Sequence, residues 1–127
     1  MRAVWLSAAA SIVLGAAGQL LFKRFASLVG ALPDTAGALL ARVLPDAGYL
    51  LAGVVAYLAA VLLWLRVLRS LPLAQAYPLL SLGYALVYVG AIAWLGEAPT
   101  LNRTLGTLLV VLGVALAAPV AERQPQR

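Results

Sequence analysis

The chain has 127 residues, of which 65% are hydrophobic and only 10% are charged, and its net charge is +5. Typical globular domains carry about 25% charged residues, so this composition excludes an ordinary water-soluble domain. Cys and His are both absent, which excludes disulfides, thiolate nucleophiles, haem ligation and most zinc or iron sites. We therefore expect neither a cofactor nor a bound metal.

The charged residues lie at the edges of, or between, four uncharged blocks, which are residues 3–22, 47–65, 70–96 and 104–121. A helix rises about 1.5 Å per residue, so roughly 20 apolar residues cross a hydrocarbon core about 30 Å thick. The pattern predicts an all-α integral membrane four-helix bundle that forms one domain over residues 1–127. Its spans are expected at about 3–22, 47–68, 72–96 and 101–120.

The first block has to be weighed against a cleaved signal peptide, for which Arg2 would supply the basic region. Its apolar run is longer than the usual core of about 7–15 residues in such a peptide, and three further spans follow. We therefore expect the first helix to be retained.

The connection between the first two blocks, residues 23–46, is the longest. Its apolar and basic part, residues 36–44, lies between two Pro-Asp pairs and predicts a short helix at the membrane interface. The first helix can also continue past Lys23 toward Ala31, with its cations reaching the membrane surface.

The other two connections are tight turns. Arg69 ends the second helix and Pro72 can open the third. Gly96 ends the third helix, and Thr100 is placed to cap the fourth. The second, third and fourth helices are therefore predicted to pack as consecutive antiparallel hairpins.

An even number of spans places both termini on one side of the membrane. That side carries five cations, Arg2, Arg66, Arg69, Arg123 and Arg127, and the other side carries four, Lys23, Arg24, Arg42 and Arg103. The excess favours cytoplasmic termini, although one charge is small enough that insertion in both orientations stays open. The basic residues are scattered at helix ends and form no clustered face, so we expect no nucleic-acid partner.

Polar stripes run along the first and third predicted helices. The first carries Ser7, Ser11, Gly15, Gly18 and Gln19, and the third carries Tyr77, Ser81, Tyr84 and Tyr88. Because polar groups within a membrane face the bundle interior, we expect these stripes to line a shared cavity. The interfacial aromatic belt is the alternative for Tyr77 and Tyr88.

Other positions predict packing and bending. The second helix carries a stripe of Gly53, Tyr57, Ala60 and Trp64. Gly106 and Gly113 mark a packing surface on the fourth helix, or alternatively a dimer surface. Pro78 and Gly83 permit a kink in the third helix, where either a moving gate or a static bend is compatible with the sequence.

Several motifs together resemble the small four-helix members of the drug/metabolite transporter superfamily, the EamA-like proteins. They include Gly18-Gln19-Leu20-Leu21-Phe22-Lys23, Ala76-Tyr77-Pro78-Leu79-Leu80-Ser81 and the Gly96-Glu97 turn. Within the superfamily the chain is most similar to the subunits of the 4-amino-4-deoxy-arabinose-phosphoundecaprenol flippase, and more distantly to the small multidrug resistance exporters. The resemblance covers nearly the whole chain apart from residues 25–46.

The resemblance implies a flippase subunit that translocates an undecaprenyl-phosphate-linked aminosugar, or a similar lipid, across the bacterial inner membrane. It implies a homodimer or a heterodimer with a homologous small subunit. Lys23 and Arg24 at one mouth, and Arg66 and Arg69 at the other, would hold the phosphate, with Lys23 and Arg66 as the first candidates. The path between them would be lined by Gln19, Tyr77, Ser81 and Tyr84, with Glu97 belonging to the turn. Binding of bulk anionic lipid is the alternative for the cations.

Two other functions compete with transport of a lipid-linked sugar. An exporter of small cationic or polyamine-like compounds needs a titratable carboxylate within a span; here the matching stretch has Gly15, and every acid lies outside the spans. The third hypothesis is a non-transporting accessory subunit of a membrane glycosyltransferase. We expect no enzymatic activity, because the spans offer no His, Cys or paired acids for acid–base or nucleophilic chemistry.

Overall fold

The computed structural model describes residues 2–30 and 35–122, with side chains described through Leu116. These residues form four helices, which are α1 (Arg2–Val29), α2 (Ala36–Leu68), α3 (Leu73–Leu95) and α4 (Leu101–Glu122). The described part contains no strand, so the all-α prediction is confirmed. By length and composition α1, α2 and α3 can each cross a membrane. α4 has 22 residues, and its part with described side chains, Leu101–Leu116, is also apolar.

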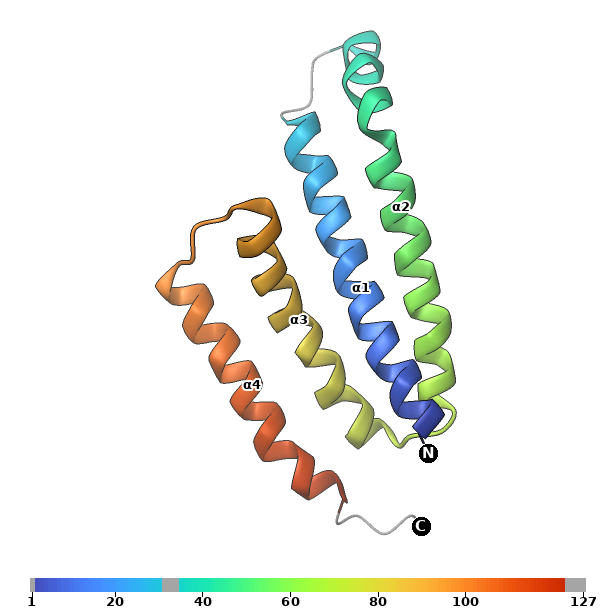
Figure 1. The fold of residues 1–127 in the computed structure, drawn as a ribbon, viewed down its shortest axis with the longest axis vertical. Coiled ribbons are helices and arrows are strands. Elements are labelled where there is room, and N and C mark those ends of the chain that lie inside the picture. The colour runs from blue at the N-terminus through green and yellow to red at the C-terminus, as the bar shows by residue number, and fades with distance from the viewer. Residues whose placement is uncertain (1, 31–34, 123–127) are drawn as a thin grey trace.

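The first two helices are longer than the sequence blocks predicted. α1 has 28 residues and α2 has 33, so they are about 42 and 50 Å long at 1.5 Å per residue. Both extend beyond the α3–α4 turn in Figure 1. α1 runs past Lys23, which is the continuation that the sequence allowed.

The prediction of a separate interfacial helix over residues 36–44 is wrong. This segment is the beginning of α2, which continues through Pro45 without a break. The Thr35 hydroxyl caps its first turn by accepting a hydrogen bond from the Ala38 amide at 3.4 Å. Pro45 removes one backbone hydrogen bond, but the Ala- and Leu-rich turns around it favour a helix strongly enough to span that defect.

The four helices lie in the spatial order α2, α1, α3, α4, as Figure 1 shows. α3 scarcely contacts α2 and packs against α1 instead, so the prediction that these consecutive helices form a packed hairpin is wrong. α1 packs against both α2 and α3. Its Ser11 and Gly18 face α2, while its larger Leu20 fits against Gly90 of α3. The beginning of α1 and the end of α4 lie at the same end of the bundle.

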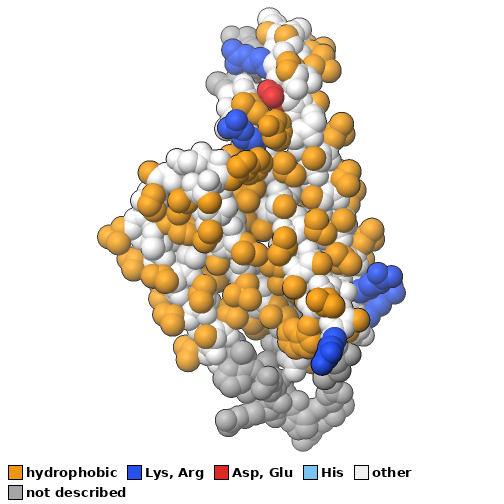
Figure 2. Space-filling view, in the orientation of Figure 1, with side chains coloured by type: hydrophobic (Ala, Val, Ile, Leu, Met, Phe, Trp, Pro, Cys, Tyr) orange, Lys and Arg blue, Asp and Glu red, His pale blue; other side chains and the backbone are white. Residues whose placement is uncertain are grey.

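Small residues form the buried interior. Ala8, Ala16, Ala60, Ala76 and Ala91 are among the residues that the bundle hides from the outside. Large apolar side chains point outward: Leu62 is 67% exposed and Leu101 is 74% exposed. Figure 2 shows hydrophobic side chains over the middle of the visible face, with Lys and Arg toward its ends. Small residues inside and Leu outside are expected for helices that associate in lipid, where the outward Leu meets acyl chains.

α3 ends at Gly96 as the sequence predicted, whereas the capping of α4 by the Thr100 side chain stays a prediction. Gly96 adopts a left-handed conformation with φ 68° and ends α3. The Glu97 amide donates to the Ala91 carbonyl at 3.2 Å, which fixes the backbone of the turn. At the other turn, Arg69 ends α2 as predicted and Pro72 directly precedes the first residue of α3.

Candidate functional site

A cavity of about 350 Å³ lies between α1, α2 and α3, and we call it the central cavity. Its polar and small lining residues include Ser11 and Gln19 of α1, Tyr57 and Trp64 of α2, and Gly83 and Tyr84 of α3. Apolar residues such as Ile12, Val61 and Leu80 complete the wall. The volume is at the lower end of the range of about 300–1,000 Å³ that is typical of small-molecule sites.

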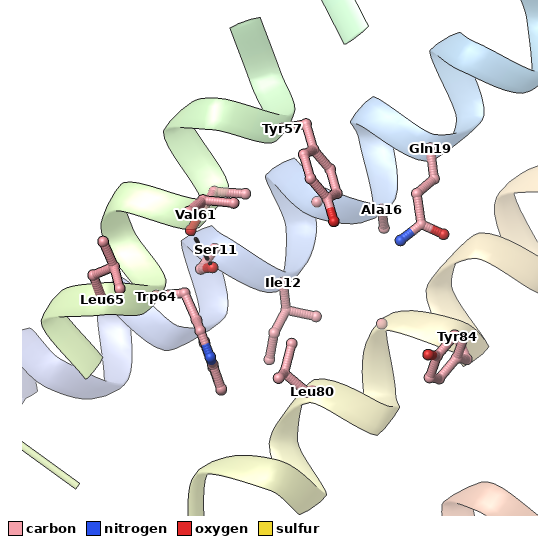
Figure 3. A pocket seen from close by; sticks show the side chains of 13 residues that line it. Ser11, Ile12, Ala16, Gln19, Tyr57, Val61, Trp64, Leu65, Leu80 and Tyr84 are labelled. Carbon is pink, nitrogen blue, oxygen red and sulfur yellow. Dashed lines mark hydrogen bonds between the residues drawn. The ribbon is translucent and has the colours of Figure 1, made fainter. Parts of the chain in front are cut away.

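The polar groups of the central cavity differ in their surroundings: one is bonded between two helices, and others project from the cavity wall. Ser11 is buried, and its hydroxyl donates to the Ala60 carbonyl across the α1–α2 interface at 2.7 Å, a bond that Figure 3 marks. The Gln19 amide extends from α1 toward α3, and Tyr57 and Trp64 project from α2 (Figure 3). The described lining residues carry no formal charge. The chemistry that the cavity offers is therefore hydrogen bonding and aromatic contact.

The structure brings together only some of the predicted path residues. Gln19 and Tyr84 line the central cavity, as does Gly83, which was predicted to permit a kink. Tyr77 and Ser81 are not among its lining residues, and the Ser81 hydroxyl donates to the Tyr77 carbonyl at 3.4 Å within α3. Their role in a path beyond this cavity stays a prediction.

Tyr57 and Trp64 were missing from the predicted site. Their stripe on α2 was visible in the sequence as Gly53, Tyr57, Ala60 and Trp64 at helical spacing, but it indicated only packing. The structure adds that α1 presents its small residues to this same stripe, which brings the two aromatic side chains to the cavity wall.

An ion triad joins three elements at the end of the bundle opposite the first residue of α1. The Lys23 ammonium of α1 lies 2.5 Å from Oε1 of Glu97, and the Arg103 guanidinium of α4 donates to Oε2 of the same carboxylate at 3.0 Å. The hydrogen bond from Lys23 lowers the pKa of Glu97 below its usual value of 4.5; partial burial opposes this shift, and the charges of Lys23 and Arg103 add to it. Glu97 is thus a carboxylate shared between two cations at neutral pH.

Comparison with known proteins decides the family. The chain is 39% identical over 118 residues to a probable 4-amino-4-deoxy-L-arabinose-phosphoundecaprenol flippase subunit ArnF of Yersinia enterocolitica, covering 88% of this chain and 92% of that protein. It is 42% identical over 115 residues to the protein of the same name from Pseudomonas aeruginosa, covering 87% and 80%. The chain belongs to the ArnF family of flippase subunits. No family model matches it, so its place in the wider superfamily rests on the motifs, and no solved structure matches it either.

A shorter match agrees with this ArnF assignment. The ArnF protein of Serratia proteamaculans is 48% identical over 66 residues, which is 50% of this chain. The family and the apolar helices together make the chain a multi-pass membrane protein.

The remaining predicted residues of this ArnF family member are not among the lining residues of the central cavity. Arg66 is in the last turn of α2, at the end of the bundle opposite Lys23. Pro78 lies inside α3, which continues through it, and whether a gate operates there stays a prediction. On α4, a Cβ atom added at Gly106 or Gly113 would meet no described residue within 4 Å. These two glycines therefore lie on an open face within the chain.

Proposed function

We propose that the chain is a subunit of an inner-membrane flippase that moves 4-amino-4-deoxy-L-arabinose-phosphoundecaprenol, or a similar polyprenyl-phosphate sugar, between leaflets. The observation that carries this proposal is the match over 92% of a relative with that name. We propose no catalytic step, because translocation makes and breaks no covalent bond.

The central cavity supports the assignment of the sugar. A sugar ring offers hydroxyls and a partly apolar face. The complementary groups in the cavity wall are the Gln19 amide and the aromatic side chains of Tyr57, Trp64 and Tyr84. Its described lining has no carboxylate, which disfavours the runner-up function, a proton-coupled exporter of cations. The polyprenyl tail would stay in lipid outside the helices.

The phosphate needs a cation at each mouth. Lys23 lies one helical turn beyond Gln19, so it can hold a phosphate while the sugar occupies the cavity. Arg66, next to the lining residue Leu65, is the proposed counterpart at the other mouth. Tyr77 and Ser81 are proposed to continue the path along α3 toward that mouth.

The proposal includes a dimer, either with a second copy or with a homologous small subunit. α4 packs against α3 and against no other helix in the described part of the chain. Its glycines Gly106 and Gly113 leave a face on which another helix can approach closely. A second subunit packed there would enclose more of the path than one layer of helices can.

The function is tested by reconstituting the full chain into vesicles, alone and with its homologous partner, and measuring translocation of the lipid-linked sugar. Lys23→Ala is expected to weaken lipid binding about ten- to a hundredfold, which is the size of a charge-assisted contact. Lys23→Arg should retain most activity, and Lys23→Glu should lose it while the protein still inserts. Arg24→Ala is the matched control, since it removes a neighbouring cation outside the ion triad. Normal transport by a Lys23→Ala, Arg24→Ala double variant would rule out the phosphate site.

The cavity has its own test. Tyr84→Phe removes one hydroxyl from the cavity wall and is expected to slow transfer with a smaller effect on lipid binding. Tyr49→Phe removes a hydroxyl from α2 outside the lining and serves as the control. Equal rates for the two variants would exclude Tyr84 from the path. Translocation by the partner alone, at the full rate, would instead support the accessory-subunit hypothesis.

The orientation is tested with single cysteines, because the chain has none of its own. We propose cytoplasmic termini, so Thr100→Cys should be labelled from outside intact cells and Ser70→Cys should not. Equal labelling of both positions would indicate insertion in both orientations, and labelling of position 70 alone would reverse the proposal.

A further inference from the structure

The ion triad is built so that one anion sits between two cations from different helices. Glu97 uses a separate carboxylate oxygen for each partner, Oε1 for Lys23 and Oε2 for Arg103. A phosphate group also presents several oxygens on one centre and favours Lys and Arg as partners. The Glu97 carboxylate therefore occupies the position between Lys23 and Arg103 that an incoming phosphate would take.

We propose that the ion triad is the docking site for a zwitterionic headgroup, with Lys23 and Arg103 binding the phosphate and Glu97 binding the ammonium of the aminosugar. The inference rests on the proposed function and names the part of the substrate that the site selects. It makes Glu97 a specificity-determining residue for the amino group.

The number of charges favours a replacement of Glu97 by the phosphate between the two cations. The triad has two cations and one carboxylate, and the headgroup has one phosphodiester anion and one ammonium. When the phosphate replaces Glu97 between the cations, the released carboxylate would be left without a partner unless the ligand supplies a positive charge. The ammonium supplies it, so each of the five charges keeps a neighbour of opposite sign. A neutral sugar would leave Glu97 unpaired, and that difference is the source of the selectivity.

The exposure of the three side chains allows the exchange to occur. Lys23 is 42% exposed, Glu97 is 28% exposed and Arg103 is 59% exposed. Ion pairs that retain this much contact with solvent are weak and are broken at little cost. A fully buried triad would resist opening, because each released ion would be stranded away from water.

The turn between α3 and α4 holds Glu97 in contact with Lys23, near the Gln19 end of the central cavity. The left-handed Gly96 and the hydrogen bond from the Glu97 amide to Ala91 fix the turn that carries the carboxylate. Lys23 is one turn along α1 from Gln19, which lines the cavity. The described cavity wall has no formal charge, so the charged groups of the ligand find their partners at the triad while the sugar ring faces the cavity.

The test compares two lipids that differ only at the amino group of the sugar. Full-length protein in lipid nanodiscs is titrated with 4-amino-4-deoxy-L-arabinose-phosphoundecaprenol and with the same lipid after N-acetylation, which removes the positive charge. The wild-type chain should prefer the free amine by about tenfold, the lower end expected for a hydrogen bond between charged groups. In Glu97→Gln the preference should fall to within about twofold, because binding of the free amine weakens while binding of the acetylated lipid is unchanged or tighter.

Two further variants separate specificity from folding. Asp46→Asn removes an acid of α2 outside the triad and should keep the wild-type preference. Glu97→Asp keeps the charge on a shorter side chain and should retain part of it, which decides the matter if Glu97→Gln fails to insert. Equal affinity of the wild type for the two lipids would overturn the inference and leave the flippase intact. Equal weakening of both lipids in Glu97→Gln would also overturn it, since Glu97 would then only hold the helices together. If the wild type binds neither lipid, the proposed function itself fails.

Discussion

The two halves of the chain form helix pairs of different kinds. In α1–α2 the backbones approach closely, since a methyl group on Gly18 would lie 3.1 Å from the Gly53 carbonyl. In α3–α4 the pair is linked by a hydrogen bond of 2.6 Å between the hydroxyls of Tyr88 and Thr104, and the glycines of α4 face open space. Close backbone contact leaves little room for movement, whereas the open face of α4 is free to meet another helix.

The two pairs contribute differently to the central cavity and to the ion triad. α1–α2 is the closely packed pair, and it supplies Ser11, Tyr57 and Trp64 to the central cavity. α3–α4 is the pair with an unfilled face, and it touches α1 through Gly83 and Gly90 and through the ion triad. The cavity and the triad both lie between the two pairs, so a shift of α3–α4 relative to α1–α2 would alter both at once.

The largest effect is expected from a bulky residue at the α1–α2 contact. Gly18→Leu places a side chain against the Gly53 carbonyl and the Tyr57 backbone, neither of which can move aside. The variant should lose roughly 3 kcal/mol or more of stability, at the upper end for overpacked interiors. Thermal unfolding in detergent measures it, and a melting temperature equal to that of the wild type would show that the two backbones are not in close contact.

The same substitution on the other pair should act on association instead. A Cβ atom added at Gly113 meets nothing within 4 Å in the described part of the chain, so the melting temperature of Gly113→Leu as a monomer should stay close to that of the wild type. If α4 is the dimer surface, the added side chain should weaken association by about tenfold or more, since overpacking by 1.4 kcal/mol corresponds to that factor. Single-molecule bleaching in vesicles reports the dimer fraction. Unchanged association and transport would remove α4 from the interface.

The sequence predicted much of this contrast, and its misses have a physical cause. Uncharged blocks located the helices, because the thickness of the bilayer fixes the length of a span. Gly96 was identified as the end of α3, since a left-handed turn favours glycine. The start of α2 was missed because Pro45 suggested a break, whereas Thr35 caps a helix that continues through the proline.

Helix neighbours could not be predicted from connection length. A tight turn after Arg69 implied that α3 packs on α2, yet α1 lies between them. The choice depends on which small residues face each other, which one sequence does not specify. For the same reason the polar stripes predicted Gln19 and Tyr84 at a cavity but not Tyr57 and Trp64 beside them. The partner of Lys23 was missed because Glu97 lies 74 residues away and only the fold brings them together.

A smaller effect is expected from the buried hydrogen bond of the first pair. Ser11→Ala removes the bond to Ala60 between α1 and α2 and should cost about 0.6 kcal/mol, the average for such bonds between membrane helices. Ser7→Ala is the matched control, because the Ser7 hydroxyl bonds to Ala3 within its own helix. Unfolding in a denaturing detergent should show that Ser11→Ala is less stable than Ser7→Ala. The reverse order would mean that the α1–α2 interface does not depend on Ser11.

The smallest expected effect concerns the link between the two pairs and its dependence on pH. The folded protein holds the pKa of Glu97 below 4.5, the value that the unfolded chain approaches. A carboxyl with a lowered pKa stabilises the folded state fully above 4.5, and this contribution is lost as the pH falls through the lowered value. The melting temperature of the wild type should therefore decline relative to that of Glu97→Gln as the pH is lowered below 4.5. Because the pair is exposed to solvent, added salt should reduce the difference at neutral pH. A difference between the two proteins that stays constant from pH 7 to pH 3 would contradict an ionised link from Glu97 to Lys23 and Arg103.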